Sequence, residues 1–322
     1  MANAFTGTAA MANLVQTAYD RALEFALRAQ PTFRNIVDKK PVQQAMPGSS
    51  VVFEIYQDLA QQITPLNELV DPDAVAAGQP TTISVTLNEY GNAILVSNKL
   101  DLFSFTDVTA GLVNQVAWNL IDSVDLIVQN VLQAGTQVIR QNGDPATVLP
   151  LYNGGTTNAV QATSIYSSKA IRLAVAKLRF QKVHPNKGSF YTTYISPEVS
   201  MDLRAETGNA AWRAPHEYSS AGNIWAGEIG EYEGSVFIET PRVNYTLNAG
   251  TVPTNVFQTY TTGQQALAEA VAEEFHTVRG PVVDKLTRFQ PLGWYGVAGW
   301  SLYRPEALIR TETTASIHTT GA

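Results

Sequence analysis

The sequence predicts an α+β fold built from two lobes. Three observations carry this prediction: a length of 322 residues, an alternating strand pattern over 82–90, and a long apolar helical pattern over 108–131. A chain of this length exceeds what one hydrophobic core usually serves, so two cores are expected. Apolar periods of two and of 3.6 residues in one chain require both strands and helices.

A long two-stranded arm is predicted over 50–97. In its second strand Ile83, Val85 and Leu87 alternate with polar residues. The strand therefore has one apolar face, which we call the dry face, and one polar face. The connection over 59–80 is unusually long for a compact domain, so we expect a hairpin with an elaborated tip. Because an isolated two-stranded arm is only marginally stable in water, something must cover its dry face.

The longest predicted helix spans about 106–134. Apolar residues recur at every fourth position from Val108 to Val128, and Ser104 and Asp107 have the spacing of a capping box. At about 1.5 Å per residue, such a helix is on the order of 40 Å long.

The segment 1–49 is predicted to be an N-terminal arm with one short helix. Five apolar residues recur at helical spacing over 12–27, and Gln30-Pro31 ends the pattern. These residues are Leu14, Ala18, Ala22, Phe25 and Ala26. The stretch 31–50 has no clean period, and we expect it to lie extended along another surface, with a mobile linker as the alternative.

Turn signals over 142–155 mark the expected boundary between the lobes. Beyond it we expect a helix from Ser167, a strand over 191–195 and a short helix opened by Pro197. A turn then leads into a strand over 230–241.

The stretch 286–303 interleaves glycines with aromatic residues. The glycines are Gly293, Gly296 and Gly299, and the aromatics are Phe289, Trp294, Tyr295, Trp300 and Tyr303. Glycine lets another backbone approach closely, and Trp and Tyr supply large, stiff contact areas. We interpret the stretch as a late pair of strands with structural glycines. Two hypotheses explain it: an ordinary sheet core with a bulge, or a sheet that closes a subunit built to tile.

Composition narrows the class of protein. Charged residues make up 15% of the chain, against roughly 25% in average soluble domains, and no uncharged apolar run is long enough to span a membrane. Few charges are typical of subunits that share much of their surface, although composition drift explains them equally well.

Charge and cysteine content exclude further classes. The net charge is −7, without the basic cluster of a protein that grips phosphates. The absence of cysteine excludes disulfides and thiolate metal sites. We see no secretory signal at the start of the sequence and expect synthesis in a cytosol.

Near the end of the chain, Arg288 and Pro291 precede the glycine–aromatic run, which closes on Gly299-Trp300 and a short last strand. This segment resembles the corresponding one in the major capsid proteins of tailed bacteriophages, those with the Hong Kong 97-type fold. The passage 230–241 is similar to the central lobe of the same family. The order of elements agrees as well, since a long spine helix follows an extended loop in that family.

The resemblance implies a Hong Kong 97-type phage capsid fold with four parts. These are an N-terminal arm over 1–49, an extended β-hairpin loop over 50–97, a peripheral lobe over 98–150 and 256–322 that contains the spine helix, and a central axial lobe over 151–255. In that family the extended loop reaches over a neighbouring subunit. We therefore expect Ile83, Val85 and Leu87 to contact a neighbour.

Three aromatic residues in a charge-poor loop are further candidates for intersubunit contacts. They are Trp212, Tyr218 and Trp225. Aromatic side chains can also stack on bases, but no basic cluster surrounds these three, so a subunit contact is the favoured interpretation.

No catalytic, cofactor or metal site is expected. The histidines stand far apart, without partners at i+3 or i+4 for a zinc pair; they are His184, His216, His276 and His318. Asp71, Asp73 and Glu68 are interpreted as solvated loop acids rather than a cation site. Glu231, Glu233 and Glu239 are interpreted as the exposed face and turn of one strand rather than as paired catalytic carboxylates.

The function implied by the resemblance is that of a major capsid protein. Copies would self-assemble through hexamers and pentamers into an icosahedral shell that encloses double-stranded DNA without tight binding. Scaffolding, portal and cement proteins are the further partners implied, with no membrane. The protein would belong to the virion after assembly in the bacterial host cytoplasm.

Two alternatives stay open at this point. An encapsulin-like nanocompartment shell would share the fold but enclose cargo enzymes. An enzyme with a dispersed active site would need a pocket of convergent titratable residues, for which the sequence offers no candidate.

Overall fold

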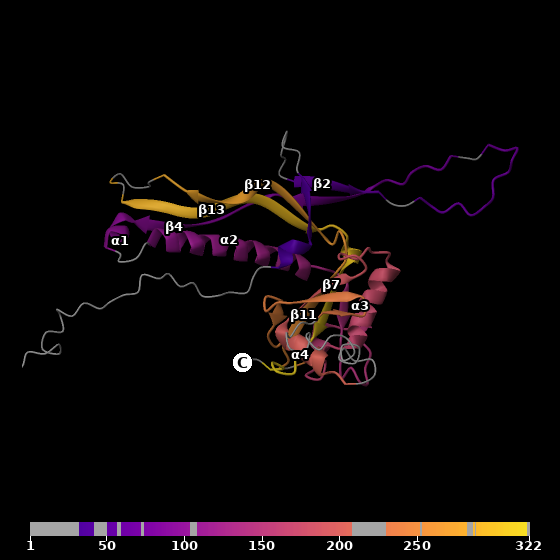
Figure 1. Cartoon of the computed structure of the whole chain (residues 1–322). Coiled ribbons are helices and arrows are strands. Elements are labelled where there is room, and N and C mark those ends of the chain that lie inside the picture. Colours follow the sequence, from indigo (N-terminus) through magenta and orange to yellow (C-terminus); the bar gives the residue numbers. More distant parts are fainter. Residues whose placement is uncertain are drawn as a thin grey trace, which may run out of the picture.

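The computed structural model describes residues 32–41, 50–56, 59–71, 74–103, 108–207, 230–251, 253–281, 286 and 288–320. These residues form two lobes and a projecting hairpin (Figure 1). We call the four-stranded sheet with helices α1 (Asn98–Phe103) and α2 (Val108–Gln133) the long lobe. We call the eight-stranded sheet with helices α3 (Ser168–Phe180) and α4 (Pro197–Ala205) the compact lobe. The helix predicted over 12–27 lies outside the described residues.

The sheet of the long lobe has the strand order β1-β12-β13-β4. Its strands are β1 (Val37–Pro41), β4 (Asn88–Ser97), β12 (Leu267–Arg279) and β13 (Phe289–Leu302). β13 is antiparallel to both of its neighbours, and β1 adds a parallel edge strand to β12. The glycine–aromatic run is therefore one central strand. The predicted pair of strands is wrong, because ladders on both sides keep the run extended.

Helix α2 covers one face of this sheet and coincides with the helix predicted over about 106–134. Val116 packs against Leu292 and Trp294 in a small core. The indole Nε1 of Trp294 donates a hydrogen bond to Asn119 Oδ1 at 2.9 Å, so the one polar atom of this large side chain has a partner on the helix.

The sheet of the compact lobe has the order β6-β5-β14-β11-β7-β9-β8, with β10 beside β11. Its strands are β5 (Val138–Arg140), β6 (Leu151–Tyr152), β7 (Tyr191–Ile195), β8 (Glu231–Tyr232), β9 (Ser235–Glu239), β10 (Tyr245–Thr246), β11 (Val256–Thr262) and β14 (Leu308–Thr313). Three short 3-10 helices complete the described elements: η2 (Phe33–Ile36), η3 (Thr157–Ala159) and η4 (Pro305–Ala307).

The core of the compact lobe combines local and distant parts of the chain. Helix α3 buries Ile171 and Leu178 in it, as expected for an amphipathic helix. Phe33 is fully buried there, with its ring centroid 5.3 Å from that of Tyr194 and 6.4 Å from that of Tyr260. The stretch after Pro31 thus inserts an aromatic anchor into the lobe and then continues as β1.

The division between the lobes differs from the predicted one. β5, β11 and β14 lie within 98–150 and 256–322, which we assigned to the peripheral lobe, yet all three belong to the compact sheet. β11 pairs there with β7 and β14. Such partners lie far apart in the chain, so their pairing leaves no local pattern in the sequence.

Helix α2 joins the two lobes because its halves enter different cores. Val116 belongs to the core of the long lobe, whereas Val128 and Leu132 are fully buried in the core of the compact lobe. The helix therefore connects the two lobes rigidly, and we call it the strut between them.

A polar contact fastens the middle of this strut to the compact lobe. Asp125 Oδ1 accepts a hydrogen bond from the backbone N–H of Phe33 at 2.8 Å. Arg242 forms ion pairs with Asp122 and, over 3.4 Å, with Asp125. Burial raises the pKa of Asp125, and the Phe33 N–H and Arg242 offset this only in part.

Candidate intersubunit surface

The base of the projecting hairpin is fixed to the long lobe of its own chain. Strand β2 (Ser50–Ile55) pairs antiparallel with β3 (Thr81–Thr86). Val85 of β3 is fully buried, and the space over Gly299 of β13 accommodates it. A Cβ on Gly299 would lie 2.9 Å from Val85 Cγ1 and would overlap the carbonyl oxygen of Thr86. On the partner strand, the ring of Phe53 lies 6.2 Å from that of Tyr303.

This packing corrects two expectations about 50–97. Val85 is buried within its own chain, so it is not a contact that awaits a neighbour, and the dry face of β3 is covered there by β13. Ile83 and Leu87 are half-buried, and their contact with another subunit stays a prediction. The hairpin ends at Thr86, because 88–97 form β4, which pairs with β13 in the long lobe.

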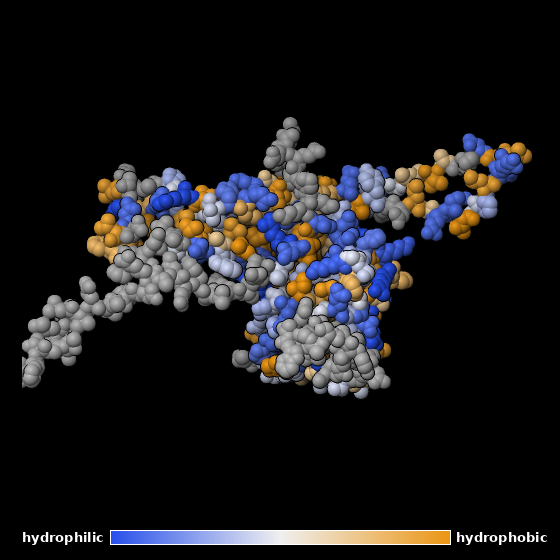
Figure 2. All heavy atoms as spheres, in the orientation of Figure 1, coloured by the Kyte–Doolittle hydropathy of each residue, from blue (hydrophilic) through white to orange (hydrophobic). Residues whose placement is uncertain are grey.

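Beyond its base, the hairpin exposes an apolar loop. Every described residue over 59–79 is exposed, and the loop projects well away from both lobes (Figure 1). Hydrophobic residues recur along it (Figure 2). The large ones among the described residues are Leu59, Ile63, Leu66, Leu69, Val70 and Val75, with Ile63 88% and Leu69 92% exposed. Exposed apolar side chains in such number are typical of interaction sites.

One local turn shapes this loop. The backbone N–H groups of Leu69 and Val70 donate to Asn67, at its side-chain Oδ1 over 3.2 Å and at its carbonyl oxygen over 3.3 Å. This arrangement is an Asx turn, and it presents Leu69 at a bend. We name the described residues of 59–79 the hairpin loop.

A second exposed apolar patch lies at the far end of the long lobe (Figure 2). It comprises Leu95 at the end of β4 and Leu100, Leu102 and Phe103 on α1, with Leu102 80% exposed. The N–H of Asn98 donates to the carbonyl of Arg288 at 2.8 Å, which holds α1 beside the start of β13. The sequence analysis missed this patch, although three large apolar residues within 100–103 were a visible signal.

The other two glycines of the run also face close neighbours. A Cβ on Gly293 would lie 2.5 Å from the carbonyl oxygen of Asn92 on β4, and one on Gly296 would overlap the ring of Phe275. That ring stacks on Trp300, with 6.1 Å between centroids. The structural role predicted for these glycines remains a prediction, and this geometry supports it.

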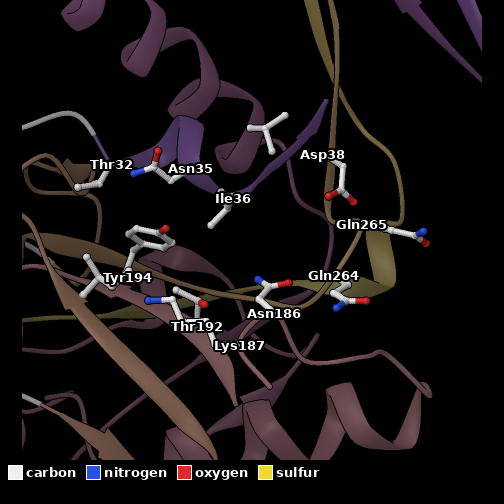
Figure 3. A pocket seen from close by; sticks show the side chains of 12 residues that line it. Thr32, Asn35, Ile36, Asp38, Asn186, Lys187, Thr192, Tyr194, Gln264 and Gln265 are labelled. Atoms are coloured by element: carbon white, nitrogen blue, oxygen red, sulfur yellow. The ribbon is translucent and has the colours of Figure 1, made fainter. Parts of the chain in front are cut away.

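A polar cavity of about 760 Å³ lies between the lobes. Figure 3 shows Asn35 and Ile36 on one side of it and Thr192, Tyr194 and Asn186 on the other. Most of its lining consists of neutral amide and hydroxyl groups. Burial raises the pKa of Tyr194, so its hydroxyl stays protonated. Such a lining offers hydrogen bonds, and Asp38 and Lys187 are its charged members.

Within the described ranges, no group of three or more His, Asp or Glu side chains converges on a common metal position. In the same ranges, no helix has the length and apolarity needed to cross a membrane. The three predicted aromatic contacts, Trp212, Tyr218 and Trp225, lie outside the described residues.

The comparisons with known proteins agree with this fold. A family model described as phage capsid protein matches residues 157–307. The capsid of Ralstonia phage GP4 is 13% identical with a TM-score of 0.71, and the match covers 94% of this chain and 96% of that one. The capsid of the cyanophage P-SCSP1u is 15% identical with a TM-score of 0.70 and 94% coverage of both chains.

A third structure extends the match to nearly the whole chain. The acidic stable capsid structure of the Helicobacter pylori bacteriophage KHP30 is 12% identical with a TM-score of 0.70, covering 98% of this chain and 99% of that one. No curated protein matches the sequence.

The fold is the Hong Kong 97-type fold of these capsid structures, and the predicted fold class is confirmed. Residues 157–307 match the sequence pattern of the phage capsid protein family. The resemblance that rested on 230–241 and 286–303 is thereby confirmed.

Proposed function

We propose that this chain is a major capsid protein that self-assembles through hexamers and pentamers into an icosahedral shell around double-stranded DNA. The observation that carries the proposal is the hairpin loop, an apolar segment projecting from a body with the capsid fold. A protruding apolar element can meet a complementary surface elsewhere on an identical subunit and so produce a head-to-tail contact. Such contacts generate rings when the rotation between subunits closes.

The lobes take the roles implied by the family. The long lobe is proposed as the peripheral lobe, with α2 as its spine helix, and the compact lobe as the axial lobe. The hairpin reaches over the neighbouring subunit in the same ring. Its base cannot move independently, because Val85 is locked against Gly299, so its direction is set by the subunit that carries it.

Charge favours a container rather than a binder of DNA. A net charge of −7 opposes tight phosphate contact and lets packaged DNA slide. The role is structural and not catalytic. Scaffolding, portal and cement proteins are the further partners of the proposal, which places assembly in the host cytoplasm and the product in the virion.

Electron microscopy and sedimentation of the purified chain test the proposal. Closed shells or capsomer-sized rings are expected, and particles from producing cells should protect DNA from nuclease. A stable monomer at high concentration in both low and high salt would contradict shell formation. Particles that hold a protein cargo in place of a genome would point to the encapsulin-like alternative.

A matched pair of variants tests the role of the hairpin loop. Replacing Ile63, Leu66 and Leu69 by Ser removes three exposed apolar side chains and should abolish shells while leaving the melting temperature of the subunit unchanged. Replacing Gln61, Gln62 and Gln79 by Ser changes the same loop without removing apolar surface. Equal assembly of both triple variants would show that the loop is not an intersubunit contact.

A further inference from the structure

Strand β4 is an edge strand of the sheet in the long lobe. Its ladder with β13 runs without a bulge from Asn88 to Ser97. Among the described strands, none pairs with the other side of β4. Residues 90–97 carry neither a charge nor a proline. Native proteins use charges, prolines and bulges to protect such edges, so an unprotected edge is a template for a further strand.

An apolar cavity flanks this edge on the face of the sheet turned away from α2. Trp294 faces α2, so its neighbours Gly293 and Tyr295 point to the other face. There the register places Ala93 beside Gly293 and Gly91 beside Tyr295. These four residues line a cavity of about 590 Å³, which is hollow next to the edge because glycine has no side chain. The cavity is also lined by His276, Val278, Gly280 and Pro291.

A second cavity, of about 190 Å³, flanks the same edge on the side of α2. Asn92 and Ala93 line both cavities, so the two lie on opposite faces of one stretch of β4. Gln115 and Asn119 of α2 contribute amides to the second cavity. Asn119 Oδ1 accepts hydrogen bonds from Asn92 at 3.1 Å and from Trp294 at 2.9 Å. This cavity therefore suits small or neutral polar side chains.

We propose that residues 59–64 of a second copy of this chain add to β4 as a further strand. Successive residues of a strand point to opposite faces, so the added strand would place alternate side chains in the two cavities. Main-chain hydrogen bonds would supply the affinity and the cavities the selectivity. The inference rests on the proposed function, because it names the surface that receives the hairpin loop.

The pattern of 59–64 matches the two cavities. Ile63, which is 88% exposed, would enter the apolar cavity, and Ala60 and Gln62 would face the amide-lined one. The segment belongs to no helix or strand of the described structure, so pairing with β4 would break no existing ladder. Neither 59–64 nor 90–97 carries a charge, so the contact buries no unpaired ion.

The positions of the two surfaces favour contact between copies. The hairpin loop projects beyond one end of the long lobe, whereas β4 runs to the other end, at α1 (Figure 1). A loop that points away from its own β4 can pair with the β4 of a neighbour. Such a contact joins different surfaces of identical subunits and is therefore head-to-tail.

The absence of cysteine from the chain allows cross-linking between chosen positions. In shells of Gln61→Cys/Ala93→Cys, a short bifunctional thiol reagent should join copies into products of twice the subunit mass and more, with the linked peptides identified by mass spectrometry. Gln79→Cys/Ala93→Cys is the matched control, since Gln79 is equally exposed in the other limb of the hairpin loop. The control should give at least about tenfold less product. Equal yields from the two variants would overturn the proposal.

Paired prolines give a second readout, measured as the yield of shells by sedimentation. Neighbouring N–H groups of a strand point to opposite edges, so one proline of Gln61→Pro/Gln62→Pro removes a donor to β4. This variant should form at least about tenfold fewer shells. Ala76→Pro/Ala77→Pro makes the same change in the other limb and should assemble like the unmodified chain.

The outcomes separate this inference from the proposed function. All four substituted positions are exposed, so neither variant should change the melting temperature of the free subunit. Equal assembly of both variants, with shells formed by the unmodified chain, would refute strand addition by 59–64 and leave the proposed function standing. An unmodified chain that stays monomeric would refute the proposed function and the inference together.

Discussion

Gly299 sets the distance between the hairpin and the sheet of the long lobe. Its missing side chain leaves the space that Val85 and the carbonyl of Thr86 occupy. In Gly299→Val, at least one of these backbones must move, and the buried position offers little room. We expect a loss of about 3 kcal/mol or more in the free energy of unfolding, measured by urea denaturation, because overpacking and backbone displacement add.

Gly78→Val is the matched control for this change. Gly78 lies in the exposed part of the hairpin loop, where an added Cβ has nothing within 4 Å. The same substitution there should change the free energy of unfolding by less than about 0.5 kcal/mol. If Gly299→Val unfolds at the same urea concentration as the unmodified chain, the close contact between β3 and β13 does not exist in solution.

Asp125 should make stability depend on pH. Because burial raises its folded-state pKa above the unfolded value, the native state holds the proton more tightly, so this group adds stability as the pH falls through the folded pKa. Asp125→Asn removes the titration. The free energy of unfolding of the unmodified chain should therefore rise relative to that of the variant between pH 7 and about pH 4. A difference that stays constant or shrinks over this range would show that the carboxylate is not desolvated.

At the scale of elements, the hairpin divides into an anchored base and an exposed loop. We expect protease to cut within 59–80 in free subunits and much more slowly in shells, since all described residues over 59–79 are exposed in the single chain. Replacing 62–78 by a short Gly-Ser turn should leave a folded two-lobed subunit that assembles poorly, because the paired strands and Val85 stay in place.

Limited proteolysis followed by mass spectrometry measures the first effect, and sedimentation measures the second. Cleavage at the exposed apolar patch on α1, in the same subunit, serves as the reference against which cleavage within 59–80 is compared. If free subunits protect 59–80 as fully as shells do, the loop packs on its own subunit and has no role in assembly.

The sequence was sufficient for elements whose pattern is local. The four-residue apolar spacing identified α2, and Pro197 marked the start of α4. The alternation over 82–90 identified strand structure, but it did not show that Leu87 separates β3 from β4, because both strands continue the same period. The pairing of strands could not be predicted from the sequence. β11 pairs with β7 and β14, which lie far from it in the chain, and such pairing produces no periodic pattern in the sequence.

The candidate surface was predictable only in outline. The length of the connection over 59–80 indicated an elaborated loop, and its Leu and Ile residues were visible. Burial of Val85 was not, because it depends on a glycine more than 200 positions later in the chain. The contact of Asp125 with Phe33 was hidden for the same reason: the two residues are 92 positions apart.

At the scale of the whole molecule, shells of this chain should be held together without covalent bonds. Disulfides are impossible without cysteine, and no lysine–asparagine pair is marked by the sequence as a cross-link. Boiling shells in detergent should therefore release a single band of subunit mass on a denaturing gel. A ladder of multimers that survives boiling would reveal a covalent link and contradict this expectation.

The parallel pairing of β1 with β12 has a consequence for how the protein is made. Val37 leaves the ribosome early, yet its partner Leu267 follows roughly 230 positions later, a delay of about 10 to 50 seconds at bacterial rates of synthesis. The central strands of both sheets, β13 and β11, also come from the last third of the chain. Neither sheet can therefore be completed before these late strands have been synthesised, and a subunit becomes competent for its neighbours only after that.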